Sequence, residues 1–223
     1  MKKYYNEVLY LIICSFISYS FFYIRNTYIE PEDFHFRFMI WNLILAWIPY
    51  LCSFLFLFFQ SKRFLIFSFP LIIVWFFFFP NSFYLITDLI HIKRHVNNIH
   101  WFSVIMLFSF TWTGIILGFA SLNHIFESIK NKTKFLEQVV FIESFIFLTS
   151  LGIYLGRIPR WNSWDVLSKP INLIKETLDI FINYEKNKEA LIFIGSYFII
   201  INMIWLGISL FKKNTIFESN FDI

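Results

Sequence analysis

The stretch from Phe64 to Ile86 reads FLIFSFPLIIVWFFFFPNSFYLI and contains no charged residue. An apolar segment of about 20 residues is long enough to cross a hydrocarbon core about 30 Å thick as a helix. Proline has no backbone N–H to donate, so Pro80, followed by Asn81, predicts that this helix kinks or restarts near its end. The stretch therefore predicts a transmembrane helix that is broken at Pro80.

Five more stretches of this kind lie along the chain. The predicted spans are Val8–Ile24, Phe38–Phe59, Phe64–Ile86, Trp101–Leu122, Phe135–Tyr154 and Ala190–Phe211. Of the 223 residues, 58% are hydrophobic and 15% are charged, whereas soluble domains contain about 45–50% apolar and about 25% charged residues. We therefore predict an all-α membrane protein with six transmembrane helices, forming a single polytopic domain over residues 1–223.

The first predicted span resembles a signal peptide, because Lys2 and Lys3 precede an apolar run. A signal peptide ends in small residues at its cleavage site, whereas this run ends in Ile24 and Arg25, so we expect an uncleaved span. The two cysteines, Cys14 and Cys52, lie inside apolar runs, and no disulfide is expected.

Lysine and arginine in the connections predict that both termini are cytoplasmic. The nine cations of the predicted cytoplasmic side are Lys2, Lys3, Lys62, Arg63, Lys130, Lys132, Lys134, Lys212 and Lys213. The four in the opposite short loops are Arg25, Arg37, Lys93 and Arg94, while the connection 156–189 holds six cations and five acids. Because the cations flank apolar runs, the net charge of +4 does not indicate nucleic-acid binding.

The long connection contains a predicted amphipathic helix over residues 170–183. Its apolar residues Ile171, Ile174, Leu178 and Phe181 recur at steps of three and four. This helix is too short and too charged to span, so we expect it to lie on the outer membrane surface or to cap the bundle. The tryptophans expected at the same level, as an interfacial belt, are Trp41, Trp101, Trp161 and Trp164.

The first candidate site follows the broken helix. In a helical segment, Asn81, Tyr84, Asp88, His91 and His95 form one stripe. A carboxylate and an imidazole three residues apart on one face suit an orienting acid with a general base, or two metal ligands. The alternative is that they are polar residues that end a helix at headgroup level. The metal set Asp88, His91 and His95 is weak, because no H-E-x-x-H signature accompanies it.

The second candidate site opens the long connection with two guanidinium groups, two indoles, an amide and a carboxylate. Its residues are Arg157, Arg160, Trp161, Asn162, Trp164 and Asp165. Arginine suits two-pronged binding of phosphate or carboxylate, and tryptophan stacks on a ligand while lying in the interface. The alternative is membrane anchoring, which gives Asn162 and Asp165 no role.

Three polar residues fall inside predicted spans: Asn42, Glu143 and Asn202. A charged residue at mid-depth costs about 2.5–3.5 kcal/mol on insertion scales, so Glu143 should face the bundle interior. It is either a proton-relay residue or, as we favour, a neutral acid that hydrogen-bonds Asn202 or a serine.

Two segments of the chain carry a resemblance to a known family: Pro80-Asn81 through Tyr84 to Asp88 and His91, and Gly156-Arg157 through the Arg-Trp-Asn-Ser-Trp-Asp run at 160–165 to Pro170. Together they resemble the bacterial integral membrane protein family known as domain of unknown function 1361. The resemblance covers nearly the whole chain, supports the six-span architecture and the residues of both segments, and leaves the activity open. His95 lies outside the resembling segment.

Three hypotheses of function remain. The first is an outward-facing pocket in which Arg157 and Arg160 hold an anionic headgroup or lipid-linked substrate, and Asp88, His91 and Asp165 carry out any proton transfer. The second is a component of a transporter or channel, with Glu143 on the path. The third is an envelope assembly partner without catalysis. The expected location is the bacterial plasma membrane, and the sequence leaves any cofactor unknown.

Overall fold

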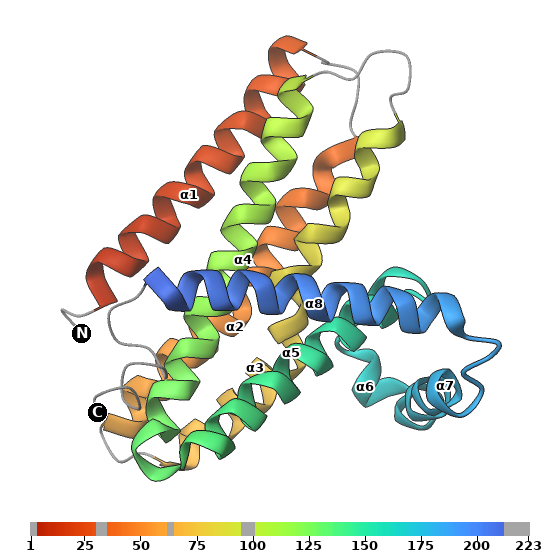
Figure 1. Cartoon of the computed structure of the whole chain (residues 1–223). Coiled ribbons are helices and arrows are strands. Elements are labelled where there is room, and N and C mark those ends of the chain that lie inside the picture. Colours follow the sequence, from red (N-terminus) through yellow and green to blue (C-terminus); the bar gives the residue numbers. More distant parts are fainter. Residues whose placement is uncertain (1–3, 30–34, 62–64, 95–100, 212–223) are drawn as a thin grey trace. The chain divides into compact units, whose positions relative to one another are not determined.

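The structure is a computed structural model that describes residues 4–29, 35–61, 65–94 and 101–211, and every element in these ranges is helical. The helices in Figure 1 are α1 (Tyr5–Ile24), α2 (Phe38–Ser61), α3 (Leu65–Tyr84), α4 (Trp101–Ile129), α5 (Phe135–Arg157), α6 (Asp165–Ser168), α7 (Pro170–Ile182) and α8 (Lys188–Phe211). The chain divides into two compact units, Met1–Ile125 and Phe126–Ile223, and each is described by itself. The assignment of residues 1–223 to one domain stays a prediction.

Six helical segments of the described chain are long and apolar enough to cross a membrane, which confirms the predicted all-α membrane fold. Their bounds are Tyr5–Ile29, Phe38–Gln60, Ile66–Ile90, Trp101–Lys132, Phe135–Arg157 and Lys188–Leu210. The fourth segment continues well past the predicted end at Leu122, because the polar His124 lies fully buried inside the fold. Phe16, Ile192 and Met203 are about 70% exposed along their helices, as expected where lipid is the solvent.

The first unit is an up-and-down arrangement of α1 to α4, because contacts between neighbouring helices pair their residues in reversed order. The contacts that set α1 against α4 are Arg25 Nε to Ser103 Oγ (2.8 Å), Ser18 Oγ to Thr113 Oγ1 (3.2 Å) and His124 Nε2 to Glu7 Oε1 (3.0 Å). The contacts that set α2 against the third span are Asn42 Nδ2 to Asp88 Oδ2 (2.8 Å), just after α3, and Ser82 Oγ to the Ala46 carbonyl (3.3 Å).

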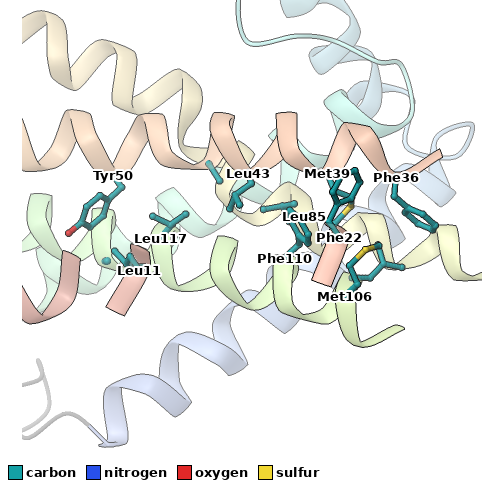
Figure 2. Close-up of a cluster of buried hydrophobic side chains, with 13 residues drawn as sticks. Leu11, Phe22, Phe36, Met39, Leu43, Tyr50, Leu85, Met106, Phe110 and Leu117 are labelled. Atoms are coloured by element: carbon teal, nitrogen blue, oxygen red, sulfur yellow. The ribbon is translucent and has the colours of Figure 1, made fainter. Parts of the chain in front are cut away.

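The core of this unit runs lengthwise between the four helices. Figure 2 shows Tyr50 at one end of the buried cluster and Phe36 at the other. The labelled core residues between them are Leu11, Phe22, Met39, Leu43, Leu85, Met106, Phe110 and Leu117. In lipid, where burial of apolar surface drives little helix association, this core contributes mainly through close packing. The polar contacts at the two ends of the core therefore help to fix how the helices are aligned along their axes.

Helix α4 approaches α3 closely at two glycines. A Cβ added at Gly114 would lie 2.5 Å from the backbone oxygen of Ser82, and one added at Gly118 would lie 2.5 Å from the ring of Phe83. Glycines four residues apart permit this close approach between membrane helices. The G-x-x-x-G spacing is visible in the sequence and would have predicted the face that α4 turns toward α3.

The third span changes helix type near its end, one turn later than predicted. The α-helix passes over Pro80 and ends at Tyr84, and Leu85–Arg94 form a 3₁₀ helix. The last carbonyls of an α-helix need other donors. Here the Thr87 hydroxyl donates to the Tyr84 carbonyl (2.7 Å), and the Thr111 hydroxyl of α4 donates to the Leu85 carbonyl (3.0 Å). These side chains fix the break at Leu85.

The second unit is built on the antiparallel pair α5 and α8. Two ring contacts set their order: Tyr154 with Phe193 (5.7 Å between centroids) and Phe147 with Phe198 (6.2 Å). The small core of this unit comprises Leu151, Ile180, Ala190 and Ile194. Because Ile180 comes from α7, the short helix is attached to the α5–α8 pair.

Candidate functional site

Asp88 is fully buried in the first unit, and Asn42 is one of its hydrogen-bond donors. The amide nitrogen Nδ2 of Asn42 lies 2.8 Å from Asp88 Oδ2. Asn81 and Tyr84, the other described members of the predicted stripe, are partly buried at the end of α3. A buried carboxylate is stable only when it is hydrogen-bonded. The structure thus joins two residues that the sequence indicates separately, one from each of two spans.

Asp88 and His91 lie one turn apart in the 3₁₀ helix, in which residues i and i+3 share a face. The backbone therefore has the spacing expected for an acid and a base on one face. The side chain of His91 and the whole of His95 lie outside the described residues. Within the described ranges, no group of three or more His, Cys, Asp or Glu residues could hold a metal ion. The weak metal set of Asp88, His91 and His95 stays a prediction.

Arg25 is a buried cation, although the sequence indicates it only as a loop charge. Its Nε donates to Ser103 Oγ, and the carbon of its guanidinium lies 4.4 Å from the centre of the Phe36 ring. Guanidinium groups stack on aromatic faces, which favours their burial once their N–H groups find acceptors. Arg25 follows Ser18 and Phe22 at steps of four and three, so its place on the buried face of α1 could have been predicted from periodicity.

Arg25, Asp88 and Ser103 form a polar layer at one end of the first unit. The apolar residues next to this layer are Phe22, Met39, Leu85 and Met106, which lie near one another in Figure 2. Arg25 follows Phe22, and Asp88 follows Leu85, by three residues each. Ser103 precedes Met106 by three residues on α4, which runs in the opposite direction. All three polar residues are therefore displaced toward the same end of the unit. A buried guanidinium group, that of Arg25, and a buried carboxyl group, that of Asp88, therefore lie at this end of the unit.

The segment that follows α5 in the second unit is ordered by its own polar side chains. Asp165 Oδ2 accepts hydrogen bonds from the backbone N–H (2.8 Å) and the side-chain Nδ2 (3.1 Å) of Asn162, and Oδ1 accepts one from the Ser168 hydroxyl (3.1 Å). These hydrogen bonds hold the pKa of Asp165 below its ordinary value, and the bond from the Asn162 backbone has the largest effect. The carboxylate thus closes the turn, a role that the alternative of simple anchoring did not provide.

The two indoles of this segment differ in environment. Trp161 Nε1 donates to Glu176 Oε2 on α7 at 2.7 Å, whereas the Trp164 side chain is 49% exposed. Arg157 is the last residue of α5 and is partly buried. Arg160 is exposed and has a positive φ of 65°, a conformation that few residues other than glycine adopt. The backbone turn thus presents Arg160 and Trp164 on the surface of this unit.

Helix α7 begins at Pro170, as predicted, and has three faces. The predicted apolar residues are exposed: Ile171 (66%), Ile174 (57%), Leu178 (52%) and Phe181 (40%). A second face is polar and carries Asn172 and Lys175, and a third, with Glu176 and Ile180, lies against its own unit. The apolar stripe is therefore largely exposed, although the Phe181 ring at its end lies 6.2 Å from the Phe147 ring of α5.

The polar residues inside the fifth and sixth spans do not pair with each other. Asn202 Nδ2 donates to the Phe198 carbonyl of its own helix (3.2 Å), and Glu143 has no hydrogen-bond partner among the described residues. The hydrogen bond that we expected from Glu143 to Asn202 or to a serine is thus not formed among the described residues. A role for Glu143 in a proton path stays a prediction.

The comparisons with known proteins identify a family and nothing narrower. No curated protein and no solved structure matches the chain. The family described as "Protein of unknown function (DUF1361)" matches residues 41–204, well over half of the chain. The match covers Asn42, Asp88 and the segment 156–182, and α1 lies before it. The chain belongs to this family of unknown function, DUF1361.

Proposed function

We propose that the chain is a multi-pass protein of the bacterial plasma membrane, with both termini in the cytoplasm, which binds an anionic headgroup on the outer face through the segment 156–182. The headgroup belongs to a membrane lipid or to a lipid-linked substrate. The observation that carries the proposal is the exposed apolar face of α7 directly beside an arginine and tryptophan segment.

The apolar face of α7 supports a position in the membrane interface. Ile171, Ile174, Leu178 and Phe181 remain 40–66% exposed in a unit that otherwise buries α7 through Ile180. Full burial of such a side chain contributes about 1.5–3 kcal/mol, so half-burial of all four in lipid contributes roughly 3–6 kcal/mol. This is enough to keep the segment at the bilayer surface, since the spans already tether it there.

The chemistry of the preceding turn supports recognition of an anion. A guanidinium group binds phosphate with two parallel N–H donors, and Arg157 and Arg160 both lie within four residues of the end of a span. Trp164 is exposed beside them and suits the headgroup level. The Trp161–Glu176 hydrogen bond attaches the turn to α7, so the cations and the lipid-facing helix move together.

Separately, within the first unit, proton transfer is assigned, as a proposal, to Asp88 and His91. Their spacing on one face of the 3₁₀ helix suits a base and its orienting acid. The Asn42 amide donates to Oδ2 of the buried Asp88, an arrangement that suits orienting a neighbouring base better than attacking a substrate directly. Asp165, the third candidate for proton transfer, has both oxygens engaged in its own turn, and we now favour a structural role for it.

The lipid contact is tested by spin labels placed on two faces of α7 in a chain without its native cysteines. A nitroxide on Ile174→Cys should be relaxed by oxygen, which concentrates in lipid, and one on Asn172→Cys should be relaxed by a water-soluble nickel chelate. If both labels respond mainly to the chelate, α7 does not lie in the interface.

Headgroup binding is tested by counting anionic lipids retained on the purified protein by native mass spectrometry. The protein is placed in nanodiscs of phosphatidylcholine with or without phosphatidylglycerol. We expect the double variant Arg157→Gln/Arg160→Gln to retain severalfold fewer anionic lipids than the wild type, while Lys186→Gln retains the wild-type number. A parallel sample with inorganic phosphate in phosphatidylcholine alone distinguishes a free anion from a lipid headgroup. Equal retention by all three proteins would contradict the proposal.

A further inference from the structure

A second polar cluster lies in the first unit, at the end of the core where Figure 2 shows Tyr50. His124 of α4 lies at its centre and is fully buried. Its Nε2 is 3.0 Å from Glu7 Oε1 of α1, and its Nδ1 is 3.0 Å from Ser53 Oγ of α2. The Tyr50 hydroxyl donates to the same Glu7 oxygen at 3.0 Å. The cluster joins three helices, and the sequence does not indicate it, because its members lie up to 117 residues apart.

The order Ser53, His124, Glu7 is that of a nucleophile, a base and an orienting acid, but the geometry excludes nucleophilic attack. Ser53 is fully buried, and its hydroxyl also lies 2.8 Å from the Tyr50 carbonyl, to which it donates. A hydroxyl has one hydrogen. Since that hydrogen goes to the carbonyl, Ser53 accepts from His124, and Nδ1 carries a proton.

The other ring nitrogen must share a proton with Glu7. A carboxylate oxygen and an unprotonated imidazole nitrogen are both acceptors, so the 3.0 Å contact between Glu7 Oε1 and His124 Nε2 requires a hydrogen between them. The Tyr50 hydroxyl supplies its own hydrogen to the same oxygen. With Nδ1 already protonated, the arrangement fits an imidazolium against a carboxylate, a charge-assisted pair.

Aromatic rings surround the His124 side of this pair, whereas the Glu7 side is partly exposed. The rings of Tyr4, Tyr50 and Phe54 lie 4.9, 5.3 and 6.3 Å from the His124 ring between centroids. The Glu7 side chain is 28% exposed, whereas His124 is 0% exposed. A proton therefore reaches the imidazole through the carboxylate.

Within the described chain, the titratable groups that face the ring are Glu7 and Tyr4 from the α1 side and Tyr50 from α2. Glu127 follows one turn later on α4 itself. No described residue of α3 places a titratable group against it. Glu7 is the one of these that touches a ring nitrogen.

We infer that Glu7 and His124, supported by Ser53 and Tyr50, form a proton-binding site that holds α1 to α4. The ligand is a proton taken from the water layer at the end of the unit where α1 begins. When Nε2 gives its proton to Glu7, and Glu7 gives it to water, a nitrogen lone pair is left facing the carboxylate. The bond between α1 and α4 is then lost, while the bond from Tyr50 to Glu7 remains.

The test is a double-mutant cycle with Glu7→Gln and His124→Gln, read as unfolding equilibria of the full chain in detergent at pH 5 and pH 8. We expect the coupling of the two residues at pH 5 to exceed that at pH 8 by about tenfold or more in the equilibrium constant, because a charge-assisted hydrogen bond is present at pH 5 and lost at pH 8. Coupling that is the same at both pH values overturns the inference.

The matched control is the hydrogen bond from Trp47 Nε1 to Ser15 Oγ, 3.0 Å, which joins α1 to α2 without a titratable group. The cycle with Ser15→Ala and Trp47→Phe should give the same coupling at both pH values. If the His124→Gln variant does not fold, infrared difference spectra of the wild type and Glu7→Gln between pH 5 and pH 8 decide the question. Imidazole protonation bands should appear in the wild type and be altered in Glu7→Gln. Spectra that are identical in the two proteins would overturn the inference.

Discussion

Replacing Gly114 with alanine should separate α4 from α3 and destabilise the first unit. The added Cβ would lie 2.5 Å from the Ser82 carbonyl oxygen and 2.5 Å from Leu85 Cδ1, where ordinary contact begins at 3.4 Å. A shortfall of roughly 0.9 Å against a backbone atom forces the helices to move, and overpacking of this kind costs about 1–3 kcal/mol. The face affected is the one that also fixes the 3₁₀ helix with Asp88.

The control is Gly195→Ala in α8, because a Cβ there would meet no atom within 4 Å. Both substitutions gain the same helix propensity, about 1 kcal/mol in favour of alanine, so the difference between the variants measures the clash alone. Gly118→Ala should fall between them, because the Phe83 ring can yield by rotation, whereas a backbone carbonyl cannot.

The measurement is reversible unfolding in mixtures of dodecyl maltoside and sodium dodecyl sulfate, followed by tryptophan fluorescence. We expect Gly114→Ala to have a free energy of unfolding about 1–3 kcal/mol below that of Gly195→Ala. If the two variants are equally stable, then α3 and α4 do not approach as closely as described, and the placement of Asp88 loses its support.

Three further outcomes are expected. Asn42→Ala should lower the free energy of unfolding by about 1–3 kcal/mol in the same assay, because it leaves buried Asp88 Oδ2 without this donor; no change would show that water replaces the amide. Trp161→Phe should increase proteolytic cleavage between α5 and α7. Adding Glu176→Ala to this variant should not increase cleavage further, since both substitutions remove the same hydrogen bond. The hydrogen bonds that lower the pKa of Asp165 contribute fully above its ordinary pKa and are lost as the pH falls through the lower folded-state value. Pepsin cleavage of that turn should therefore rise toward low pH in the wild type and be independent of pH in Asp165→Ala.

The spans and the amphipathic helix could be predicted because their signals are local. Run length gave the six spans, and steps of three and four gave α7, which ends at Ile182 where we predicted residue 183. The end of the third α-helix was displaced by a turn, because its position depends on Thr111, 26 residues away from Leu85. No local pattern contains that donor.

The polar partners were predictable only in part, for the same reason. Asn42 and Asp88 were both indicated as unusual polar residues, but their pairing spans 46 residues of sequence. The buried position of Arg25 was available from helical periodicity and was missed, because its place at the end of an apolar run favoured a loop. Glu143 was expected to hydrogen-bond Asn202 or a serine because it lies at mid-span, but depth alone does not decide which way a side chain points.

Helix α1 emerges from the ribosome long before the partners that hold it. Its contacts from Ser18 to Thr113 and from Glu7 to His124 join residues 95 and 117 positions apart, and at a synthesis rate of about 5–20 residues per second this delay is roughly 5–25 seconds. During that interval, α1 is already in the bilayer while α4 does not yet exist. Assembly of the first unit is thus completed by the fourth span, and a nascent chain that stalls before this span would leave the first helix available to the quality-control proteases of the membrane.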